Sequence, residues 1–401
     1  MRVLHVFKVF NDEQEGGVQR TITTLARATR DRSIAHRFLT LADDGPWERN
    51  DPAGNLSVRA VRRSGQLLHT DFAWRARRAF AEEARQADVI HYHLPWPVVH
   101  WLDGRVPVGT PRVATYHADI CRRPTINRLY QPHLLRFLQR LEAVIATSPV
   151  YARTSPVLRE LPPQRLHVAE LGLDVDRVDE VSLQRARRDY AETLGEGFLL
   201  FLGTTRYYKG AHVAIDALPR SGARLVIAGD SPDRAALEAR ARAHGVGDRV
   251  VFLGRVSDAA KWALLELSRG VVLPSILRAE GFGLVLLEAA AASRPAITCE
   301  IGTATSHVVR DGETGYVVPP NDPGALAEAM QRLVSDPDHA AVLGANGQAR
   351  YQQHFTARVY AERVLAVYEQ VTGRPLGDHP GGSGGRGDGE GSPAIQQGGM
   401  A

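Results

Sequence analysis

The sequence is poor in cysteine and in lysine. Its 401 residues include two cysteines, Cys121 and Cys299, which lie far apart along the chain. This excludes a disulfide scaffold and any cysteine-rich metal site, and it is typical of a reducing compartment. Only Lys8, Lys209 and Lys261 are lysines, and arginine supplies the rest of the 49 basic side chains. A GC-rich genome produces such a bias, so the bias by itself indicates no function.

Long apolar runs are also missing. No stretch of about 18 apolar residues is present, so the sequence predicts no membrane-spanning helix. The opening residues MRVLHVFKVF lack a hydrophobic signal core followed by a small-residue cleavage site, and they are typical of a first β-strand. We therefore expect a cytoplasmic protein.

The residues that are present indicate a soluble globular protein. Hydrophobic residues make up 44% of the chain and charged residues 23%, and the length is sufficient for two domains. Residues 1–190 hold 29 basic and 22 acidic side chains, a formal charge of +7, whereas the remainder holds 20 and 23, or −3. The basic first half favours peripheral contact with an anionic surface such as the inner face of a membrane. We expect no nucleic-acid partner.

Short apolar runs bounded by Gly, Pro or Asp recur along the chain, with helical segments between them. This alternation predicts an α/β fold whose parallel sheets are covered on both faces. The runs form two series, which indicates two doubly wound, Rossmann-like domains that face each other across a central cleft. The expected strands are 2–10, 36–41, 89–93, 112–116, 143–147, 198–203, 224–228, 250–253, 271–274 and 296–298.

A polar segment near 172–195 separates the two series. It predicts an N-terminal domain over residues 1–180 and a C-terminal domain over 190–355. A final amphipathic helix is expected over 356–371. Residues 373–401 are rich in Gly, Ser and Pro, so we expect a disordered tail.

The segment EGGVQRTITTLARA, residues 15–28, follows the first strand through a polar loop and opens a helix. Gly16 and Gly17 let a ligand approach the backbone, and the free N–H groups of a helix N-terminus suit a phosphate. A plain tight turn is the structural alternative. The segment lacks the third glycine of the dinucleotide-binding motif.

A second candidate segment, residues 201–218, carries the basic pair Arg206 and Lys209 in the loop after a strand. Loops at strand ends bind ligands in such sheets, and an Arg with a Lys can hold a diphosphate. The alternative is a solvated surface pair.

Residues 273–293 carry two acids, Glu280 and Glu288, within an otherwise small or apolar stretch. Burying an unpaired carboxylate is costly, so the two acids indicate a cleft rather than a core. They can accept hydrogen bonds from sugar hydroxyls, while the N–H groups of Phe282, Gly283 and Leu284 at the start of the following helix can bind phosphate. A helix-capping acid with a surface glutamate is the structural alternative.

Histidines end two strands of the first half. His91 and His93 have the spacing of a metal pair, but no carboxylate or cysteine cluster joins them nearby, so we disfavour a metal there. His117 lies just past a strand and is a candidate site residue, with a structural histidine as the alternative. Asp174 and Asp176 have metal-binding spacing but lie at the domain seam and are interpreted as linker. A diphosphate held by Arg, Lys and helix N-termini needs no metal, so we expect no metal and no other cofactor.

Taken in order, these segments resemble the retaining glycosyltransferases of family 4, which have the GT-B fold. The resemblance extends over about residues 1–371. It rests on Gly-Gly-Val at 16–18, Tyr-His-Ala-Asp at 116–119, Ile-Ala-Thr-Ser at 145–148, Leu-Gly-Leu-Asp at 171–174, Arg-Tyr-Tyr-Lys-Gly at 206–210, and the pair Glu280 and Glu288.

More narrowly, MRVLHVFK, IHYHLPWP, TYHADICRR and RYYKG are similar to bacterial mannosyltransferases of lipopolysaccharide and O-antigen assembly. That branch implies GDP-mannose as the nucleotide-sugar donor and a saccharide or lipid-linked acceptor bound by the N-terminal domain. A donor with a UDP-linked hexose is the alternative.

The resemblance also implies roles for the nucleotide-binding residues. Glu288 binds the ribose, Arg206 and Lys209 neutralise the diphosphate, and the base lies near Arg255 and Val256. Many relatives carry an arginine directly after the strand-ending glycine, where this chain has Thr204. Arg206 is expected to replace it from two residues later.

For the reacting sugar, the resemblance places Glu280 and the backbone of Phe282 and Gly283 on the donor hexose. His117 lies near the reacting bond, and Gly17 faces the diphosphate or the acceptor. No side chain is an evident nucleophile. Two other classes stay open on the sequence: a nucleotide-sugar epimerase, which needs no acceptor, and a non-catalytic sugar-nucleotide-binding protein.

Overall fold

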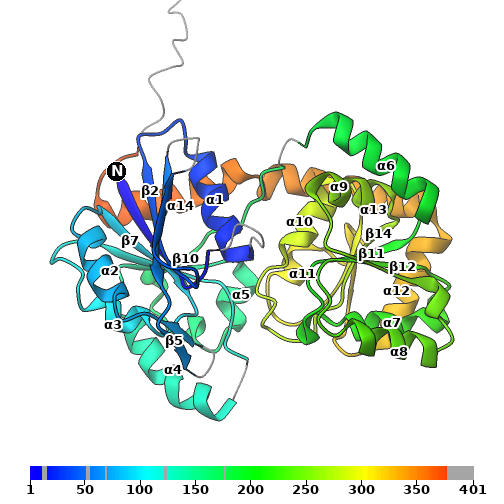
Figure 1. Cartoon of the computed structure of the whole chain (residues 1–401), viewed down its shortest axis with the longest axis horizontal. Coiled ribbons are helices and arrows are strands. Elements are labelled where there is room, and N and C mark those ends of the chain that lie inside the picture. The colour runs from blue at the N-terminus through cyan, green and yellow to red at the C-terminus, as the bar shows by residue number, and fades with distance from the viewer. Residues whose placement is uncertain (11–15, 51–54, 68–69, 122–123, 176–177, 377–401) are drawn as a thin grey trace, which may run out of the picture.

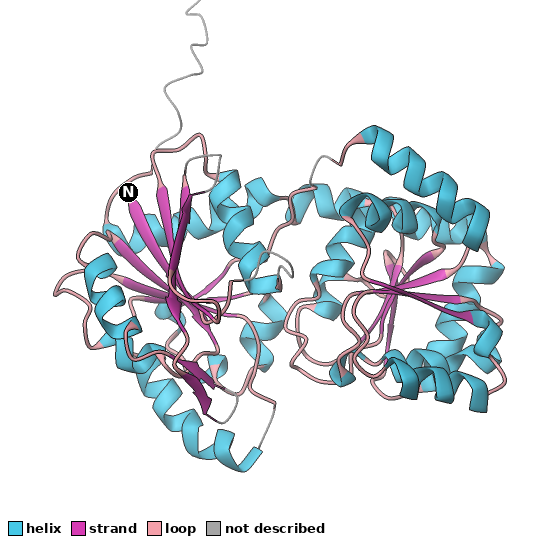
Figure 2. Cartoon of the chain, viewed as in Figure 1, coloured by secondary structure: helices cyan, strands magenta, loops and turns pink. Residues whose placement is uncertain are grey.

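The computed structural model describes residues 1–10, 16–50, 55–67, 70–121, 124–175 and 178–376. The chain forms two units, each a mostly parallel sheet with helices packed on both faces (Figure 1; Figure 2). This confirms the predicted α/β class with two doubly wound sheets.

The first sheet has the order β10-β9-β8-β7-β1-β2-β4-β3, and all its pairs are parallel except β3 with β4. A short hairpin, β5 (Gly65–Leu67) and β6 (Thr70–Phe72), forms a separate two-stranded sheet. The sheet strands are β1 (Arg2–Val6), β2 (Ala35–Ala42), β3 (Trp47–Asn50), β4 (Leu56–Arg62), β7 (Val89–Leu94), β8 (Arg112–Tyr116), β9 (Ala143–Ala146) and β10 (Leu166–Val168).

The second sheet is entirely parallel, with the order β13-β12-β11-β14-β15-β16. The strand order reverses between β11 and β14, and ligands bind at such a reversal in doubly wound sheets. Its strands are β11 (Leu199–Leu202), β12 (Leu225–Ala228), β13 (Val250–Gly254), β14 (Gly270–Leu273), β15 (Ala296–Cys299) and β16 (Gly315–Val318).

No helix among the described residues is long and apolar enough to cross a membrane. The α-helices are α1 (Gly17–Ala28), α2 (Ala76–Ala84), α3 (Val99–Asp103), α4 (Pro124–Leu138), α5 (Pro149–Thr154), α6 (Glu180–Leu194), α7 (Ala211–Ser221), α8 (Arg234–Ala243), α9 (Asp258–Leu267), α10 (Leu284–Ala291), α11 (Thr305–Val308), α12 (Pro323–Ser335), α13 (Pro337–His354) and α14 (Ala357–Thr372). Short 3-10 turns lie at η1 (Leu158–Glu160), η2 (Pro163–Arg165), η3 (Tyr207–Lys209) and η4 (Gly247–Arg249).

All ten strands expected from the apolar runs are present, but the first one is shorter than predicted. β1 ends at Val6 rather than at residue 10, and Phe10 beyond it packs its ring against Phe38 and Trp47, with centroids 5.4 and 5.9 Å away. The sequence reading omitted β3, β4, β10, β16 and the hairpin. β4 alternates apolar and polar residues, β3 is polar, and β10, β16 and the hairpin strands are only three or four residues long, so none of them has the long continuous apolar run of a central strand.

The polar segment between the sheets is also more regular than predicted. Asp179 caps α6 by accepting a hydrogen bond from the Ser182 N–H at 2.9 Å, and α6 packs against α9 of the second unit. The charged side chains of this segment therefore lie on the solvent-exposed face of a helix. Of the predicted tail, residues 373–376 are held in place, since Leu376 N–H donates to Glu369 at 2.6 Å. Residues 377–401 lie outside the described residues.

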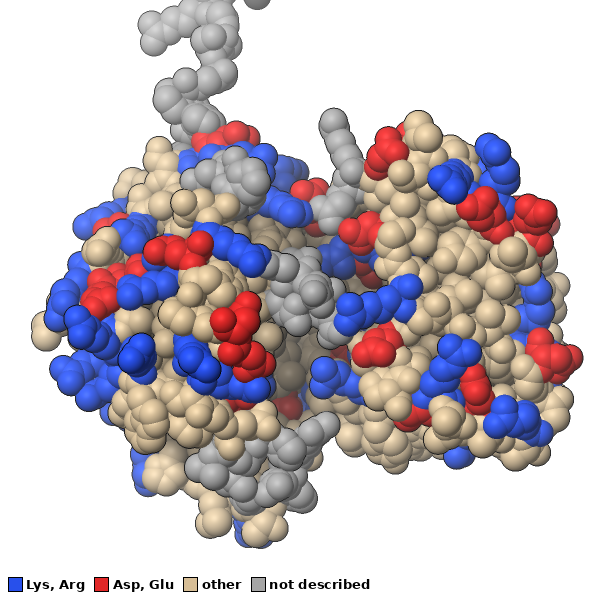
Figure 3. All heavy atoms as spheres, viewed as in Figure 1, with Lys and Arg blue, Asp and Glu red and all other residues tan. Residues whose placement is uncertain are grey.

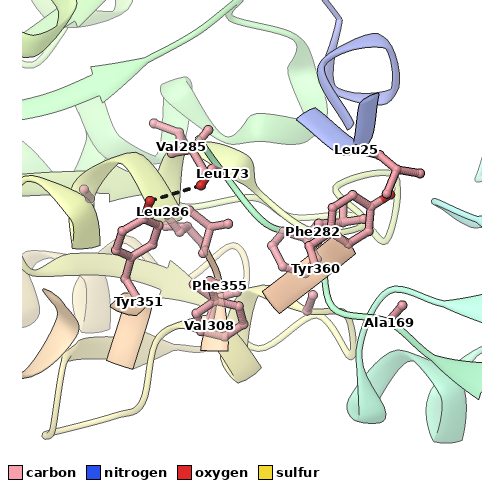
Figure 4. Close-up of a cluster of buried hydrophobic side chains, with 14 of the residues drawn as sticks. Leu25, Ala169, Leu173, Phe282, Val285, Leu286, Val308, Tyr351, Phe355 and Tyr360 are labelled. Atoms are coloured by element: carbon pink, nitrogen blue, oxygen red, sulfur yellow. Dashed lines mark hydrogen bonds between the residues drawn. The ribbon is translucent and has the colours of Figure 1, made fainter. Parts of the chain in front are cut away.

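The last helices connect the two units. In Figure 1, α13 and α14, orange to red, pass from the second unit to the first, where α14 packs beside α1. The Tyr351 hydroxyl donates to Leu173 O at 3.0 Å, and the buried rings of Phe355 and Tyr360 extend this contact (Figure 4). Gly172 has no side chain because a Cβ there would lie 2.4 Å from Thr356 O. One apolar core therefore continues across the junction.

Candidate active site

The N-termini of two helices, one from each unit, meet at the boundary between the units. α1 begins at Gly17 and α10 at Leu284, and a Cβ built on Gly17 would lie 3.6 Å from Leu284 Cδ1. Each helix starts at the carboxyl end of a central strand region, β1 and β14 respectively. Two partial positive charges therefore face one region, which favours an anionic ligand.

The loops after β8 and β14 also touch across the boundary. A Cβ on Gly281 would lie 1.8 Å from His117 O, so a side chain cannot be accommodated there without moving a backbone. The guanidinium of Arg278 donates to Asp119 at 2.8 Å across the same boundary. In the space-filling view a furrow separates the two halves, with charged side chains along both sides (Figure 3).

The two acids that interrupt the apolar stretch have different environments, and Glu288 is the buried one. Its side chain is 5% exposed, and Oε1 lies 2.5 Å from Arg20 Nη1 and 3.2 Å from Lys261 Nζ. Burial raises the pKa of Glu288, but the two cations outweigh burial and hold the pKa below its ordinary value. Glu288 is therefore ionised, and Arg20 of the first unit reaches it across the boundary.

Glu280 lies beside Lys209, with 3.6 Å between Oε2 and Nζ. Burial lowers the pKa of Lys209, yet the carboxylate of Glu280 together with Tyr208 more than offsets burial, and the net pKa is raised. The distance is long for a hydrogen bond, and Glu280 Oε2 is a buried oxygen without a hydrogen-bond partner among the described residues. An unsatisfied buried carboxylate oxygen is a ready acceptor for a ligand hydroxyl.

The loop after β11 places the basic pair. Gly210 adopts φ +75°, and a Cβ there would lie 2.0 Å from Pro274 O, so this glycine lets the loop pack directly against the end of β14. Lys209 points into the boundary, whereas Arg206 is exposed. Arg255 is also exposed, and Val256 is half-buried just after β13. No ion pair joins either arginine to another side chain in the described part of the chain.

The start of α10 has free donors. Gly283 precedes the helix with φ +79°, which a side chain rarely adopts. The N–H groups of Phe282, Gly283 and Leu284 have no hydrogen-bond partner among the described residues. Together with the helix dipole, these free donors favour an anion next to Lys209 and Glu280. At the start of α1, Gly16 is extended and has open space around it.

His117 lies at the boundary with its ring buried and its Nε2 2.9 Å from His93 Nδ1. Burial lowers the pKa of His117 to about 3, so the ring is neutral near pH 7.

His91 and His93 do gain a third neighbour, His5, whose ring nitrogens lie within 4.8 Å of theirs. Every ring nitrogen of this trio is already hydrogen-bonded, for example His91 to Tyr368 at 2.6 Å, so an ion would have to displace those bonds.

Comparison with known proteins supplies the family. Residues 15–177 match the family described as Glycosyltransferase Family 4, and residues 184–350 match Glycosyl transferases group 1. The D-rhamnosyltransferase WbpZ of Pseudomonas aeruginosa is 42% identical over 89% of this chain and 93% of its own. The chain belongs to glycosyltransferase family 4. O-antigen chain mannosyltransferase C of Escherichia coli is 36% identical to this glycosyltransferase over 92% of the chain and 98% of its own.

Solved structures share the fold of this glycosyltransferase. Sucrose-phosphate synthase from Thermosynechococcus elongatus superimposes with a TM-score of 0.76 at 21% identity, covering 93% of this chain and 99% of its own. WaaG, a glycosyltransferase involved in lipopolysaccharide biosynthesis, has a TM-score of 0.65 at 19% identity, covering 93% and 100%. At these identities the likeness concerns the fold, and it confirms the predicted GT-B architecture.

The structure of this glycosyltransferase brings together most of the residues singled out from the sequence. Gly17, His117, Lys209, Glu280, Phe282, Gly283, Leu284 and Glu288 gather at the boundary, while Arg206 and Arg255 are exposed on loops at the same edge of the second sheet. Sequence reasoning missed the cations Arg20 and Lys261, and the pair Arg278 with Asp119. Arg20 lies one helical turn after Gly17, which is the available signal. Of the proposed Asp-x-Asp pair, Asp176 lies outside the described residues.

Proposed function

We propose that this glycosyltransferase moves a hexose, mannose from GDP-mannose, to a saccharide or lipid-linked acceptor in O-antigen or lipopolysaccharide synthesis, with retention at the anomeric carbon. The name of the Escherichia coli relative, O-antigen chain mannosyltransferase C, supports mannose and the O-antigen context. The single observation that carries the catalytic part is the buried, unsatisfied Oε2 of Glu280 beside Lys209 and the start of α10.

The diphosphate would bind where positive charge converges. Lys209, the free N–H groups of residues 282–284 and the N-terminus of α10 offer donors, and exposed Arg206 can swing in from the same loop. Each charge-assisted hydrogen bond contributes about 1.5–3 kcal/mol. The same groups stabilise the leaving diphosphate without a metal ion, so we propose no resident metal.

The nucleoside would lie beside Glu288. Both Arg20 and Lys261 contact Oε1 of this carboxylate, which leaves Oε2 for the ribose hydroxyls. The base would lie against the loop after β13, near Arg255 and Val256. Because Glu288 is anionic and rigidly held by two cations, it is prepared to accept hydrogen bonds before the ligand arrives.

The reaction needs no protein nucleophile in this proposal. Glu280 and the backbone of Phe282 and Gly283 hold the donor hexose, and His117 lies on the opposite wall beside Gly281. The departing phosphate oxygen accepts the proton of the acceptor hydroxyl as the new glycosidic bond forms on the same face of the sugar. Closing the boundary between the units around the donor would exclude water, which favours transfer over hydrolysis.

The acceptor would enter from the first unit. A pocket of about 340 Å³ opens at the carboxyl ends of β1 and β2, on the same sheet edge as His117. Its wall combines the aromatic rings of Phe10 and Trp47 with carboxylates and guanidinium groups, including Asp43 and Arg63, a mixture that suits sugar faces and hydroxyls. The basic first unit would hold the enzyme peripherally at the inner membrane face, near a lipid-linked acceptor.

The nucleotide is the finer point to test first. Thermal unfolding of the purified protein should be measured with GDP, UDP, ADP, dTDP and their hexose conjugates. A ligand that binds the folded state raises the unfolding midpoint by mass action. At a concentration of 100 times its Kd, it adds about 2.7 kcal/mol to the free energy of unfolding. We expect the largest shift with GDP-mannose, its loss in Lys209→Ala, and its retention in Arg358→Ala, an exposed control on α14.

A clear shift with a UDP-hexose alone would overturn GDP-mannose and leave the rest of the proposal standing. Consumption of the donor with an isomerised sugar and no need for an acceptor would instead indicate an epimerase. Tight donor binding without transfer to any saccharide would indicate a non-catalytic binding protein.

A further inference from the structure

Four histidines on neighbouring strands of the first sheet form one continuous hydrogen-bonded row. His117 Nε2 lies 2.9 Å from His93 Nδ1, His93 Nε2 lies 3.0 Å from His5 Nδ1, and His5 Nε2 lies 2.9 Å from His36 Nδ1. The row ends where His36 Nε2 meets Thr29 Oγ1 at 2.8 Å. It follows the strand order β8, β7, β1, β2, and it begins at the candidate active site.

Thr29 sets the direction of the hydrogen bonds. Its hydroxyl has one proton, and Oγ1 lies 2.8 Å from Leu25 O, a helix carbonyl that can only accept. If the proton pointed at His36 instead, two oxygens would face each other at that distance without a proton between them. The hydroxyl therefore donates to Leu25 O and accepts a hydrogen bond from His36 Nε2.

The direction passes along the whole row because each ring has one proton. The four imidazoles are at most 8% exposed, and burial lowers the pKa of each, to about 3 for His36 and His117. A neutral ring that donates from Nε2 must accept at Nδ1. His5 therefore donates to His36, His93 donates to His5, and His117 donates to His93.

We infer that Thr29, His36, His5 and His93 are positioning residues that hold His117 in its Nε2–H tautomer, with Nδ1 presented as a bare hydrogen-bond acceptor. No described group donates to that nitrogen. A bare nitrogen pairs with a hydroxyl and is repelled by a phosphate oxygen. Resting on the proposed function for the identity of the ligand, this assigns His117 to a hydroxyl of a sugar and not to the diphosphate.

The row is built to orient a proton and not to conduct one. Thr29 is fully buried and donates to a carbonyl inside α1, so a proton entering at His117 Nδ1 would reach no solvent at the other end. The row therefore differs from a proton relay, which needs an exit. It also differs from a metal site, because its ring nitrogens other than the terminal Nδ1 are used in hydrogen bonds.

The direct test is tautomer assignment by long-range ¹H–¹⁵N NMR on ¹⁵N-histidine-labelled protein without any substrate. We expect all four rings as neutral Nε2–H tautomers. Thr29→Val removes the anchoring hydroxyl at nearly constant shape and should give mixed tautomers at His117, while Thr29→Ser should restore the wild-type pattern. A proton on His117 Nδ1 in the wild type, or a His117 signal unchanged in Thr29→Val, would overturn the inference.

A kinetic measurement extends the test. If transferase activity is established, Thr29→Val should lower kcat/KM for the donor about tenfold, the loss of about one well-formed hydrogen bond, and Thr29→Ser should stay near wild type. Equal losses in both variants, with unchanged tautomers, would mean that the hydroxyl only packs and would overturn the inference. Because the NMR experiment uses no substrate, it still tests the inference if the proposed function is wrong.

Discussion

Glu280 and Glu288 are eight residues apart, and their charges are compensated in different ways. Glu288 is locked between Arg20 and Lys261, whereas Glu280 has one cation at 3.6 Å and an oxygen with no hydrogen-bond partner among the described residues. The first arrangement stabilises the protein, and the second leaves interaction energy for a ligand. We therefore expect neutralising Glu280 to lower mainly the activity, and neutralising Glu288 to lower mainly the stability.

For Glu280 we predict a loss of activity and a smaller loss of stability than for Glu288. Glu280→Gln should lower kcat by about 10²–10³-fold, the range for removing one electrostatic contact to a transition state. Its melting temperature should fall less than that of Glu288→Gln, because Glu280 has one cation at 3.6 Å whereas Glu288 has two, at 2.5 and 3.2 Å. Transfer kinetics and thermal unfolding of one preparation check both. Near-normal turnover would remove Glu280 from the mechanism.

For Glu288 we predict a loss of stability that depends on pH. Glu288→Gln leaves Arg20 and Lys261 without their shared buried anion, and it should lower the free energy of unfolding by about 3 kcal/mol at pH 7. We expect the low end of the usual range because Lys261 keeps a second partner, Asp258, at 3.0 Å. The pKa of Glu288 is lowered in the folded state, so its contribution is present above the ordinary value of 4.5 and is lost as the pH falls through the lowered pKa.

The free-energy difference between Glu288→Gln and wild type should therefore shrink as the pH falls below about 4.5, because the wild-type carboxylate then becomes a neutral acid. Urea unfolding across that range measures it. Glu362→Gln, on an exposed helix pair, is the control and should cost no more than about 0.5 kcal/mol. A difference that is constant from pH 7 to pH 3 would contradict the assignment of an ionised Glu288.

At the scale of elements, the site is formed by loops that approach more closely than side chains permit. The loop after β14 touches the loop after β8 at Gly281 and His117, and the loop after β11 touches β14 at Gly210. These glycines bring Lys209, Glu280 and the start of α10 to one place. The chemistry of the site thus depends on positions that have no side chain.

Gly281→Ala tests this dependence. The added Cβ would lie 1.8 Å from His117 O, so the two loops must separate, and we expect at least a tenfold loss in kcat/KM with secondary structure intact. Gly104→Ala is the matched control, since its nearest atom would be 3.9 Å away. Activity and circular dichroism of both variants decide. A fully active Gly281→Ala would show that the loops need not touch.

At the scale of the whole molecule, the two units are joined by charged contacts and by the crossing α14. Arg278 links Asp119 of the first unit to Gly302 O of the second at 2.8 and 2.7 Å, and Arg20 reaches Glu288. The apolar junction around Leu173 and Tyr351 lies outside these charged contacts. We expect the apolar part to hold the units together and the charged part to set how closely the site closes.

Arg278→Ala should therefore weaken closure without unfolding either unit. We expect kcat/KM for the donor to fall about tenfold, and the radius of gyration from small-angle scattering to rise above that of the wild type. Arg358→Ala, an exposed arginine on α14, should change neither quantity. An unchanged radius together with unchanged kinetics would show that this bridge does not control closure.

The sequence by itself determined the α/β class, the two sheets and most of the residues that meet at the boundary between the units. Apolar runs recur because strands covered on both faces must be apolar, and glycines with polar residues follow them because ligand loops lie at strand ends. Four polar side chains stand out in the sequence because they lie in or next to apolar segments whose packing does not require them: Lys209, Glu280, Glu288 and His117.

Only the tertiary structure decided which of these groups are satisfied. Arg20 lies 268 residues from Glu288, and Arg278 lies 159 residues from Asp119, so no local pattern shows either pair. The histidine row joins four strand registers and the end of α1, and its direction depends on the single proton of Thr29. Hydrogen bonds and ion pairs act over a few ångströms in space, whereas a sequence records distance only along the chain.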